Sequence, residues 1–443
     1  MRLLLLVLTI LFLTAPTHDS AKKLSPQPMT QPDVIPSPTP TGTPWPRLTL
    51  NPLPVRKRPR LDNVCLVNSG DYGQKINECQ RGGRVEIIVR GDGDLLTPAI
   101  VEQGNILTIS ANTTIRPATE RMPIRLKEGA TIRGSGWTSV IRESSYQKQW
   151  GVIGRYNGSL ANEAKDERLT VRDLKIQGFE GKPFNSAPQA IELGNCVDCL
   201  VENVWLNETH SIGMQYGGAG FSGNYALRSV ARHILMTRVA SQSLACVNCD
   251  QVLFEDVWII DPGQAGGPGN TSIDFEPNGE KDRNTNNVLR RFYIDHRGSV
   301  QPTTGNGVVV QASATKLAGN VLVEDGVIVG GRGGWEAQVT NKLSNALYVF
   351  GISNVTIRNV QVSRTGQTCI YLDGPANIRL ENILCEDVGG GGVPGFIAYV
   401  EGQNFFRDIV FRYSGRGPVS NALMLKGDVQ MRGVVGWGIK PQK

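Results

Sequence analysis

The chain has 443 residues, of which 40% are hydrophobic and only 7% aromatic, and its formal net charge is +6. Eight of the 46 Lys and Arg but only two of the 40 Asp and Glu fall in the first 60 residues, so the rest of the chain holds 38 of each. A domain without net charge lacks the basic surface that nucleic-acid binding requires, which excludes that class of partner.

Residues 1–21 predict a secretory signal peptide. Arg2 precedes an apolar run from Leu3 to Leu13, and small residues follow it. The run is too short to span a bilayer, and no other stretch of the chain is long and apolar enough to do so. We therefore expect a secreted or cell-surface protein with no membrane span after cleavage. An uncleaved N-terminal anchor is the alternative.

Residues 22–60 predict a disordered linker, because Pro and Thr dominate and no hydrophobic period appears. The linker ends in a basic cluster from Arg56 to Arg60, for which simple solvation is the ordinary role. Residues 61–443 are then expected to form one domain with an N-terminal cap.

A short strand pattern recurs along this domain. Aligning the segments on a polar residue near their middle gives gaps of 30, 35, 18, 35, 34, 34, 23 and 26 residues. Strand length is constant while the loops vary, which is typical of a solenoid whose turns, here called rungs, stack on one another. The segments are LTVRDLKI (169–176), LVENVWL (200–206), ILMTRVA (234–240), LFEDVWI (253–259), VLRRFYI (288–294), VLVEDGVI (321–328), VTIRNVQV (355–362), IRLENIL (378–384) and FFRDIVF (405–411). The aligned residues are Asp173, Asn203, a polar residue near position 238, Asp256, Arg291, Asp325, Asn359, Asn382 and Asp408.

A second strand follows the first in most rungs. It has four or five apolar or alternating residues and ends at Gly, Pro or Asn, which suits parallel sheets stacked around an aliphatic interior. These strands are QAIELGNC (189–196), SIDFEPN (272–278), GVVVQAS (307–313), ALYVFGIS (346–353), CIYLDGPA (369–376), FIAYVEGQ (396–403) and ALMLKGDV (422–429). Polar residues that share one register precede the first strands, and stacked Asn side chains at such a bend can bond each other's amides. They are Asp198, Asn286, Asn320, Asn354 and Asn377.

This pattern resembles the right-handed parallel β-helix of the pectate lyase-like superfamily, an all-β solenoid. The segments GRVEIIVRGDG (83–93), NTTIRPA (112–118) and ATIRGSGWTSVIRES (130–144) are similar to its opening rungs. The resemblance covers about residues 80–440 and implies the fold, because the superfamily hosts lyases, hydrolases, epimerases and non-catalytic proteins. Residues 293–296, Y-I-D-H, are similar to the W-I-D-H run of pectate lyases, whereas the motifs of polygalacturonases are missing.

The eight cysteines raise two questions. Cys65 and Cys79 flank a loop rich in Gly and Asn at the domain start, and we expect a disulfide there. The pairs C-V-D-C (196–199) and C-V-N-C (246–249) have spacings found in zinc sites. However, Cys196 and Cys249 fall two rungs apart, roughly 10 Å, which is too far to share a metal or a disulfide. We therefore interpret these cysteines as small apolar residues of the stack.

Asp274 and Glu276 are the strongest candidate for a reactive site. Ile191, Ile273, Val308, Leu347, Ile370 and Leu423 should point inward, so the residues between them point outward. Two acids on one strand, with Cα atoms about 6.6 Å apart, should repel each other, which raises one pKa and favours a division into acid and base. The pair could instead bind Ca²⁺ with backbone carbonyls, the only cofactor that we consider.

Other outward residues of the second strands could hold a sugar chain, because acids and amides bond hydroxyl groups and aromatic rings stack on sugar rings. These candidates are Glu192, Gln311, Tyr348, Tyr371 and Asp373. At the ends of the first strands, Asp261, His296 and Arg297 are candidates to assist catalysis, with His296 the natural general base. An outward stripe of Trp205, Ala240, Trp258 and Tyr293 serves either as a glycan platform or as a floor beneath the long loops.

The sequence thus predicts a secreted carbohydrate-active β-helix that cleaves an extracellular polysaccharide as a lyase or a hydrolase, with uronate-containing polysaccharides among the candidate substrates. An epimerase of polyuronates would use the same groups. The alternative from another class is a non-catalytic glycan-binding or adhesive surface protein.

Overall fold

The structure is a computed structural model. It describes residues 63–118, 122–143, 151–155, 166–178, 189–217, 225–264, 271–299, 306–312, 315–330, 345–364, 368–374, 377–386, 396–401, 403–412, 421–426 and 429–437. The chain divides into one unit of residues 1–55 and a second of residues 56–443, and every described residue belongs to the second. The predicted signal peptide (1–21) and linker (22–60) lie outside the described residues and stay predictions.

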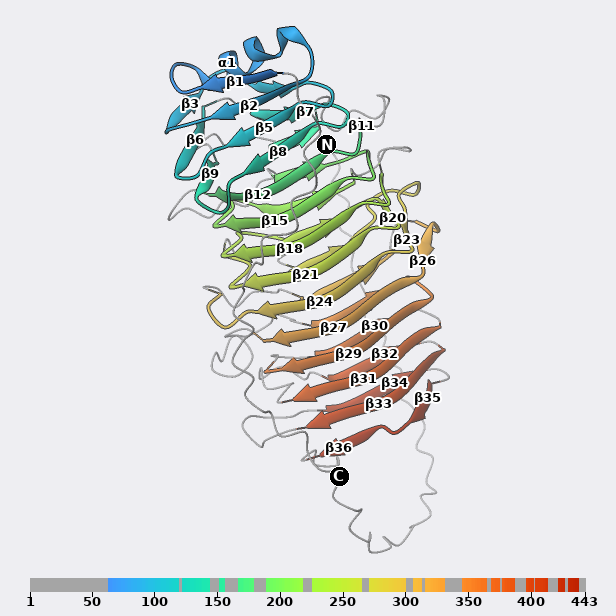
Figure 1. The fold of residues 1–443 in the computed structure, drawn as a ribbon. Helices are drawn as coiled ribbons and strands as arrows, with labels where there is room; N and C mark the ends of the chain where they lie inside the picture. Colours follow the sequence, from blue (N-terminus) through green and yellow to red (C-terminus); the bar gives the residue numbers. More distant parts are fainter. Residues whose placement is uncertain are drawn as a thin grey trace, which may run out of the picture. The chain divides into compact units, whose positions relative to one another are not determined.

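The described residues form three parallel sheets whose strands follow one another up a solenoid (Figure 1). Sheet A contains β1 Asn63–Val67, β2 Val85–Val89, β3 Gly93–Leu95, β5 Ile106–Ile109, β6 Thr113–Pro117, β8 Thr131–Gly134, β9 Ser139–Arg142, β12 Thr170–Gln177, β15 Leu200–Asn207, β18 Val230–Thr237, β21 Leu253–Ile260, β24 Val288–Asp295, β27 Val321–Val329, β29 Val355–Ser363, β31 Ile378–Glu386, β33 Asn404–Arg412, β35 Val429–Arg432 and β36 Val435–Trp437.

Sheet B contains β4 Ala99–Val101, β7 Ile124–Leu126, β10 Gly151–Arg155, β13 Gln189–Leu193, β16 Ile212–Tyr216, β19 Leu244–Cys246, β22 Ile273–Phe275, β25 Val308–Gln311, β28 Asn345–Phe350, β30 Thr368–Asp373, β32 Phe396–Glu401 and β34 Asn421–Lys426. Sheet C contains β11 Asp166–Glu167, β14 Cys196–Val197, β17 Ala226–Leu227, β20 Cys249–Asp250, β23 Asn284–Thr285 and β26 Ala318–Gly319. The sequence predicts only two strands per rung. It misses sheet C, because strands of two residues show no hydrophobic period.

The N-terminal cap is a short helix, α1 Tyr72–Cys79, followed by the 3₁₀ turn η1 Gln80–Gly82. Asp71 caps α1 by accepting the N–H of Gly73 at 3.0 Å, and it also accepts the N–H of Leu96 at 2.9 Å. Tyr72 is buried beneath the helix, and the predicted disulfide joins Cys65 to Cys79. These contacts cover the apolar end that a solenoid would otherwise leave open.

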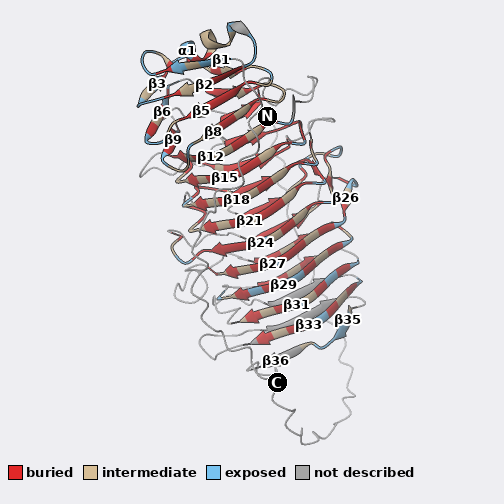
Figure 2. Cartoon of the chain, in the orientation of Figure 1, coloured by how far each residue is buried: buried red, intermediate tan, exposed pale blue. Residues whose placement is uncertain are grey.

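The core is an aliphatic column inside the rungs, shown in red in Figure 2. Register pairs the predicted inward residues of sheet B with one another, from Ile191 through Ile273 and Val308 to Leu347 and Ile370. All of these side chains are fully buried or nearly so, which confirms the predicted direction of the strands. Burial of such a side chain stabilises the fold by about 1.5–3 kcal/mol.

The aligned polar residues of the first strands have a backbone role. Each has a left-handed conformation, with φ between 51° and 56° at Asp173, Asn203, Asp256, Arg291, Asp325, Asn359, Asn382 and Asp408. Asn and Asp tolerate this region better than other non-Gly residues, and the extra residue shifts the inward–outward alternation by one. In the third rung the position belongs to His233, with φ 54°, and the strand is Val230–Thr237. The predicted segment 234–240 was therefore misplaced by several residues.

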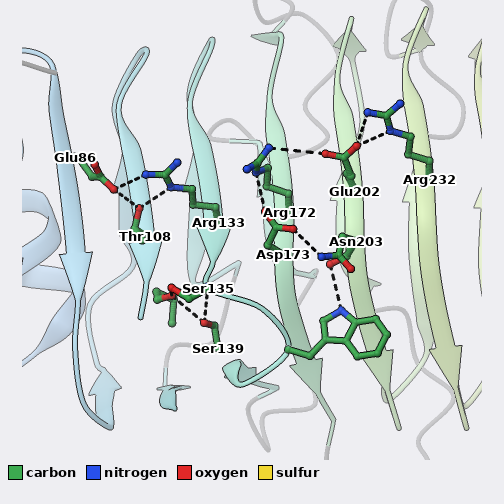
Figure 3. A network of polar contacts seen from close by, with 12 residues as sticks. Glu86, Thr108, Arg133, Ser135, Ser139, Arg172, Asp173, Glu202, Asn203 and Arg232 are labelled. Carbon is green, nitrogen blue, oxygen red and sulfur yellow. Dashed lines mark hydrogen bonds and ion pairs between the residues drawn. The ribbon is translucent and has the colours of Figure 1, made fainter. Parts of the chain in front are cut away.

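A ladder of alternating charges runs along the outer face of sheet A, beside the left-handed residues (Figure 3). Register places Arg172, Glu202, Arg232, Glu255, Arg290, Glu324, Arg358, Glu381 and Arg407 opposite one another in successive rungs. Each Glu forms an ion pair with the Arg of the following rung, as between Arg407 and Glu381 at 3.0 Å. The ladder lets charged side chains occupy one register without like charges facing each other.

Each C-x-x-C segment forms its own disulfide, Cys196 to Cys199 and Cys246 to Cys249, with Cα atoms 5.9 Å apart in both. The two segments do lie two rungs apart. β14, in the first segment, pairs with β17, and Ala226 of β17 pairs with Cys249 of the second segment. The prediction that these cysteines are merely small apolar residues was incomplete. All four are buried, but a spacing of three residues at a tight bend brings the two sulfurs of each segment together.

Candidate functional site

The outer face of sheet B carries two rows of side chains along the stack. In the first row, Glu192, Gln215, Ala245, Asp274, Val309, Tyr348 and Tyr371 lie opposite one another in seven successive rungs. Gln311, Phe350 and Asp373 form a second row two residues further along each strand, and Glu276 begins it one rung before Gln311. Adjacent rungs lie about 4.8 Å apart, so the rows present one side chain per 4.8 Å.

The carboxyl groups of Asp274 and Glu276 form a pair bridged by an amide. Asp274 is the outward residue of the three-residue strand β22, and Glu276 follows it just before Pro277 ends the run. The side-chain amide of Gln242 donates to Asp274 Oδ2 and to Glu276 Oε2, at 3.0 Å each. Gln311 Nε2, one rung further on, donates to Asp274 Oδ1 at 3.4 Å. The structure thus brings together both predicted acids and one predicted substrate-binding residue.

Burial decides the protonation state of this pair. Asp274 has only 4% of its surface exposed, whereas Glu276 is half-buried. Desolvation raises the pKa of Asp274 well above its ordinary value, and the neighbouring Glu276 carboxyl raises it further. The amides of Gln311 and Gln242 oppose this shift and are outweighed. Asp274 therefore keeps a proton more firmly than an ordinary aspartic acid.

Aromatic rings follow the acids toward the C-terminal rungs. The Tyr348 and Tyr371 rings meet edge to face with centroids 5.2 Å apart, and Phe350 lies 6.1 Å from Tyr348. All three side chains are half-buried, so their ring faces are partly open to solvent. Burial and the charge of Asp373 raise the pKa of Tyr348 to about 12, which keeps its hydroxyl protonated as a hydrogen-bond donor. A ring platform with a hydroxyl and a carboxylate at its edge suits a sugar chain.

Glu192 lies in the same row as Asp274 but three rungs before it, about 14 Å away at the spacing of parallel strands. It is 5% exposed, and burial raises its pKa to about 7 against the opposing charge of Arg155. One of its carboxylate oxygens, Oε2, has no hydrogen-bond partner among the described residues. Glu192 is thus too distant to react at the same bond as Asp274, but it can contact a bound chain two or three sugars away.

Asp261, His296 and Arg297 lie at the corner that leads from sheet A toward sheet B. Asp261 Oδ1 accepts the N–H of Gly298 at 2.6 Å, and a side chain at Gly298 would collide with that carboxylate. Arg297 binds both carboxylate oxygens of Asp295. These side chains are occupied in shaping the turn, and no hydrogen bond or ion pair joins them to the acid pair among the described residues.

His296 approaches β22 from the buried side. Its Nε2 lies 2.9 Å from the hydroxyl of Ser272, two residues before Asp274. Burial lowers the pKa of His296 to about 4, so the ring is neutral near pH 7. A neutral, 5% exposed imidazole that bonds Ser272 holds the start of β22 in place.

The aromatic stripe predicted on sheet A needs one correction. Register aligns Trp205 with Leu235, Trp258 and Tyr293, so Leu235 occupies the place that was assigned to Ala240. The Trp205 ring contacts Trp137 at 5.4 Å between centroids and Lys175 at 3.9 Å, and its indole N–H donates to Thr237. These contacts favour the packed floor over an open glycan platform.

The described residues contain no group of three His, Cys, Asp or Glu side chains placed to hold a metal ion. Likewise, no described helix is long and apolar enough to cross a membrane.

No protein-family model and no curated protein matches this sequence. Among solved structures, the catalytic domain of a GH87 α-1,3-glucanase in complex with nigerose has a TM-score of 0.57 at 11% identity, covering 86% of this chain and 70% of that one. The catalytic unit of a thermostable GH87 α-1,3-glucanase from Streptomyces thermodiastaticus strain HF3-3 has a TM-score of 0.50 at 15% identity, covering 84% and 67%. The A-module of the mannuronan C-5 epimerase AlgE6 from Azotobacter vinelandii has a TM-score of 0.48 at 14% identity, covering 84% and 94%. The chain is a right-handed parallel β-helix protein. The predicted fold is thereby confirmed.

Gln242 is the site residue of this β-helix that sequence reasoning missed. It lies two residues before β19, in a rung whose second strand was not recognised because LAC (244–246) is short and lacks alternation. Its position was accessible in principle, since Leu244 pairs with Ile273 and thereby places Gln242 one rung before Thr271. That alignment requires the loop lengths between rungs, which vary too much to be read from spacing alone.

Proposed function

We propose that this protein is a secreted glycoside hydrolase that cleaves an extracellular polysaccharide at Asp274 and Glu276. The observation that carries the proposal is the acid pair itself, one member buried and the other half-buried, with one amide donating to both. Hydrolysis of a glycosidic bond needs such a division, because one carboxyl group protonates the leaving oxygen while the other assists attack on the sugar. The glucanase activity named for the similar structures also supports a hydrolase.

The chemistry follows from the environments of the two groups. Asp274 acts as the general acid, since burial raises its pKa well above the ordinary value and favours its protonated form. Glu276 acts as base or nucleophile. The separation of the two carboxyl groups distinguishes the mechanisms, at roughly 5–5.5 Å in retaining and 6.5–9.5 Å in inverting enzymes. The two Cα atoms lie about 6.6 Å apart, so side-chain rotamers allow either separation.

The sugar chain is proposed to lie along sheet B. Tyr348 and Tyr371 hold sugar rings on one side of the acids, Gln311 and Asp373 bond hydroxyl groups, and Glu192 contacts the chain on the other side. Asp261, His296 and Arg297 assist by fixing the corner next to β22. The rung spacing of about 4.8 Å is close to the length of one sugar residue, so successive rungs can meet successive sugars.

The charge of the outer face favours hydrolysis over β-elimination or epimerisation. From β13 to β30 the two described rows contain Glu192, Asp274, Glu276 and Asp373 and no Lys or Arg. A polyuronate carries one carboxylate per sugar and would be repelled by this face. Both alternative reactions also require a base at a uronate carbon. The described corner offers a buried His296, whose pKa of about 4 makes it a weak base, and an ion-paired Arg297. We therefore propose an uncharged glycan as the substrate.

The test is a substrate panel with matched variants. Linear glucans, including α-1,3-glucan, and polyuronates are incubated with wild type, Asp274→Asn and Glu276→Gln, and both reducing ends and the absorbance of unsaturated products are followed. We expect new reducing ends from an uncharged glycan and at least a 100-fold loss in both variants. Asp325→Asn is the control, because Asn359 and Asn382 occupy the same position in following rungs.

Each other outcome selects an alternative. Unsaturated products from a polyuronate would make the protein a lyase. Glycan binding without turnover would favour the non-catalytic surface protein, and loss of activity with EDTA that Ca²⁺ restores would favour calcium at the acid pair. Full turnover in both acid variants would refute the site.

A further inference from the structure

The amide of Gln242 makes the same kind of contact as a second glutamine in its row. Gln189 lies two rungs earlier in the same register and donates its amide N–H to Gln215 Oε1, in the following rung, at 3.0 Å. Gln242 likewise reaches into the following rung, but there it meets two carboxyl groups. Glutamine side chains in this row therefore donate hydrogen bonds to the following rung, and at β22 the acceptors are the two acids.

The closeness of the two carboxyl groups demands an explanation, since one amide nitrogen lies 3.0 Å from an oxygen of each. Two carboxylates this close repel each other, and burial of Asp274 strengthens the repulsion because it lowers the local dielectric constant. The half-exposed Glu276 can rotate toward water and relieve that repulsion. Its retention beside Asp274 requires a donor that binds both carboxyl groups at once. Gln242 is that donor, and Gln311 fixes the remaining oxygen of Asp274.

We propose that Gln242 is a positioning residue that clamps Asp274 and Glu276 side by side by donating to both, so that the pair acts as one acid–base unit. The catalytic consequence rests on the proposed function, whereas the clamp does not. Only an amide suits this task at neutral pH. Its two N–H groups point in a fixed fork at two acceptors, whereas a carboxylate at the same place would add a third negative charge.

The experiment compares Gln242→Leu, which removes the donor, with Gln242→Glu, which keeps the shape. Gln189→Leu is the matched control, since it removes the equivalent amide from a contact that involves no acid. The first readout is the infrared band of a protonated carboxyl group, titrated with pH and assigned by its loss in Asp274→Asn. The second is the pH dependence of kcat/KM on the glycan that wild type cleaves.

We expect wild type and Gln189→Leu to keep the band well above the pH at which ordinary carboxyls ionise. In Gln242→Leu the band should persist to still higher pH, because the amide that stabilises the ionised carboxyl groups is lost. The same variant should lose at least tenfold in kcat/KM. Gln242→Glu should recover activity only at acid pH, where its own carboxyl is protonated and can donate.

Three outcomes overturn the proposal: an unchanged band in Gln242→Leu, an unchanged pH profile, or an equal effect of Gln189→Leu. The two proposals also fail separately. If the band behaves as expected but Asp274→Asn and Glu276→Gln cleave glycans normally, the clamp stands and the hydrolase assignment falls. If both acid variants are inactive while Gln242→Leu behaves like wild type in both readouts, the hydrolase stands and the clamp falls.

Discussion

Glu143, at the end of β9, is a buried acid that makes the stability of the protein depend on pH. It is 7% exposed, and one of its carboxylate oxygens accepts the N–H of His210 at 2.8 Å. Desolvation raises its pKa to about 8. The folded state therefore holds the proton more tightly than the unfolded state, whose pKa is near the ordinary 4.5. The resulting stabilisation is complete below about pH 4.5 and is lost as the pH rises through 8.

We predict that Glu143→Gln removes this dependence. Glutamine keeps an acceptor for the N–H of His210 and carries no charge to desolvate at high pH. Wild type should lose roughly 1.4 kcal/mol of unfolding free energy per pH unit between about 5 and 8 from this group, a few kcal/mol in total. Urea denaturation at pH 4.5, 6.5 and 8.5 measures the difference. The variant should match wild type at the lowest pH and exceed it at the highest, and a constant difference would contradict the role of Glu143.

The direction of each outward residue was predictable, because alternation along a strand and stacking between strands fix it. Asp274, Tyr348 and Tyr371 share one row, as the sequence indicates. The protonation of Asp274 was anticipated only as repulsion from Glu276, whereas burial is the larger cause. Burial depends on what neighbouring rungs and turns cover, and those are set by long-range register. For the same reason the sequence could not show that His296 faces Ser272 or that Gln242 joins the acids.

At the scale of an element, the strands of sheet A combine two halves joined by a left-handed residue. The repeated Asn and Asp were visible in the sequence as an alignment marker, but a period of two describes only uninterrupted strands. The inserted residue explains why inward positions such as Leu174 and Ile176 are two apart whereas Val171 and Leu174 are three apart. The left-handed Asn and Asp residues are therefore selected by the backbone geometry of the strands, and hydrogen bonds between their side chains in successive rungs stabilise that geometry.

We predict that glycine is more stabilising than alanine at these left-handed positions, the reverse of the usual order in a strand. Asn359 has φ 54°, so an added Cβ is strained there while glycine is not. Asn359→Gly and Asn359→Ala both remove the amide that bonds Asp325, and they differ only in that Cβ. The glycine variant should be more stable by about 1 kcal/mol in thermal or chemical unfolding.

Gln361, two residues further on the same strand, is the control. It is exposed and has no left-handed conformation, so there the alanine variant should be the more stable by roughly 0.5–1 kcal/mol. The same order of stability at both positions would show that the left-handed backbone is not what selects Asn.

At the scale of the second unit, each rung pairs only with its neighbours in the stack. The stability of such a solenoid is a sum of the stabilities of its rungs and of the interfaces between neighbouring rungs. A destabilising substitution should therefore affect nearby rungs more than distant ones. The central core illustrates the coupling between rungs. Phe254 of β21 lies 5.8 Å from Tyr216 of β16 and 5.8 Å from Phe275 of β22, measured between ring centroids, and these two residues lie two rungs apart in sheet B. Phe411 of β33 is equally buried but lies close to the C-terminal end of the stack.

We predict that Phe254→Ala and Phe411→Ala cost a similar 3–5 kcal/mol locally but differ in reach. Hydrogen exchange followed by mass spectrometry should show faster exchange on both sides of β21 in Phe254→Ala, including the acid pair on β22, and little change in β2 to β9. In Phe411→Ala the faster exchange should be confined to β31, β33 and the strands after them, because nothing beyond that end is supported by the lost contacts. Glycan cleavage should then fall in the first variant and persist in the second. A uniform rise in exchange across both variants would mean that the whole stack unfolds as one unit, and that the acid pair draws its rigidity from the entire β-helix rather than from adjacent rungs.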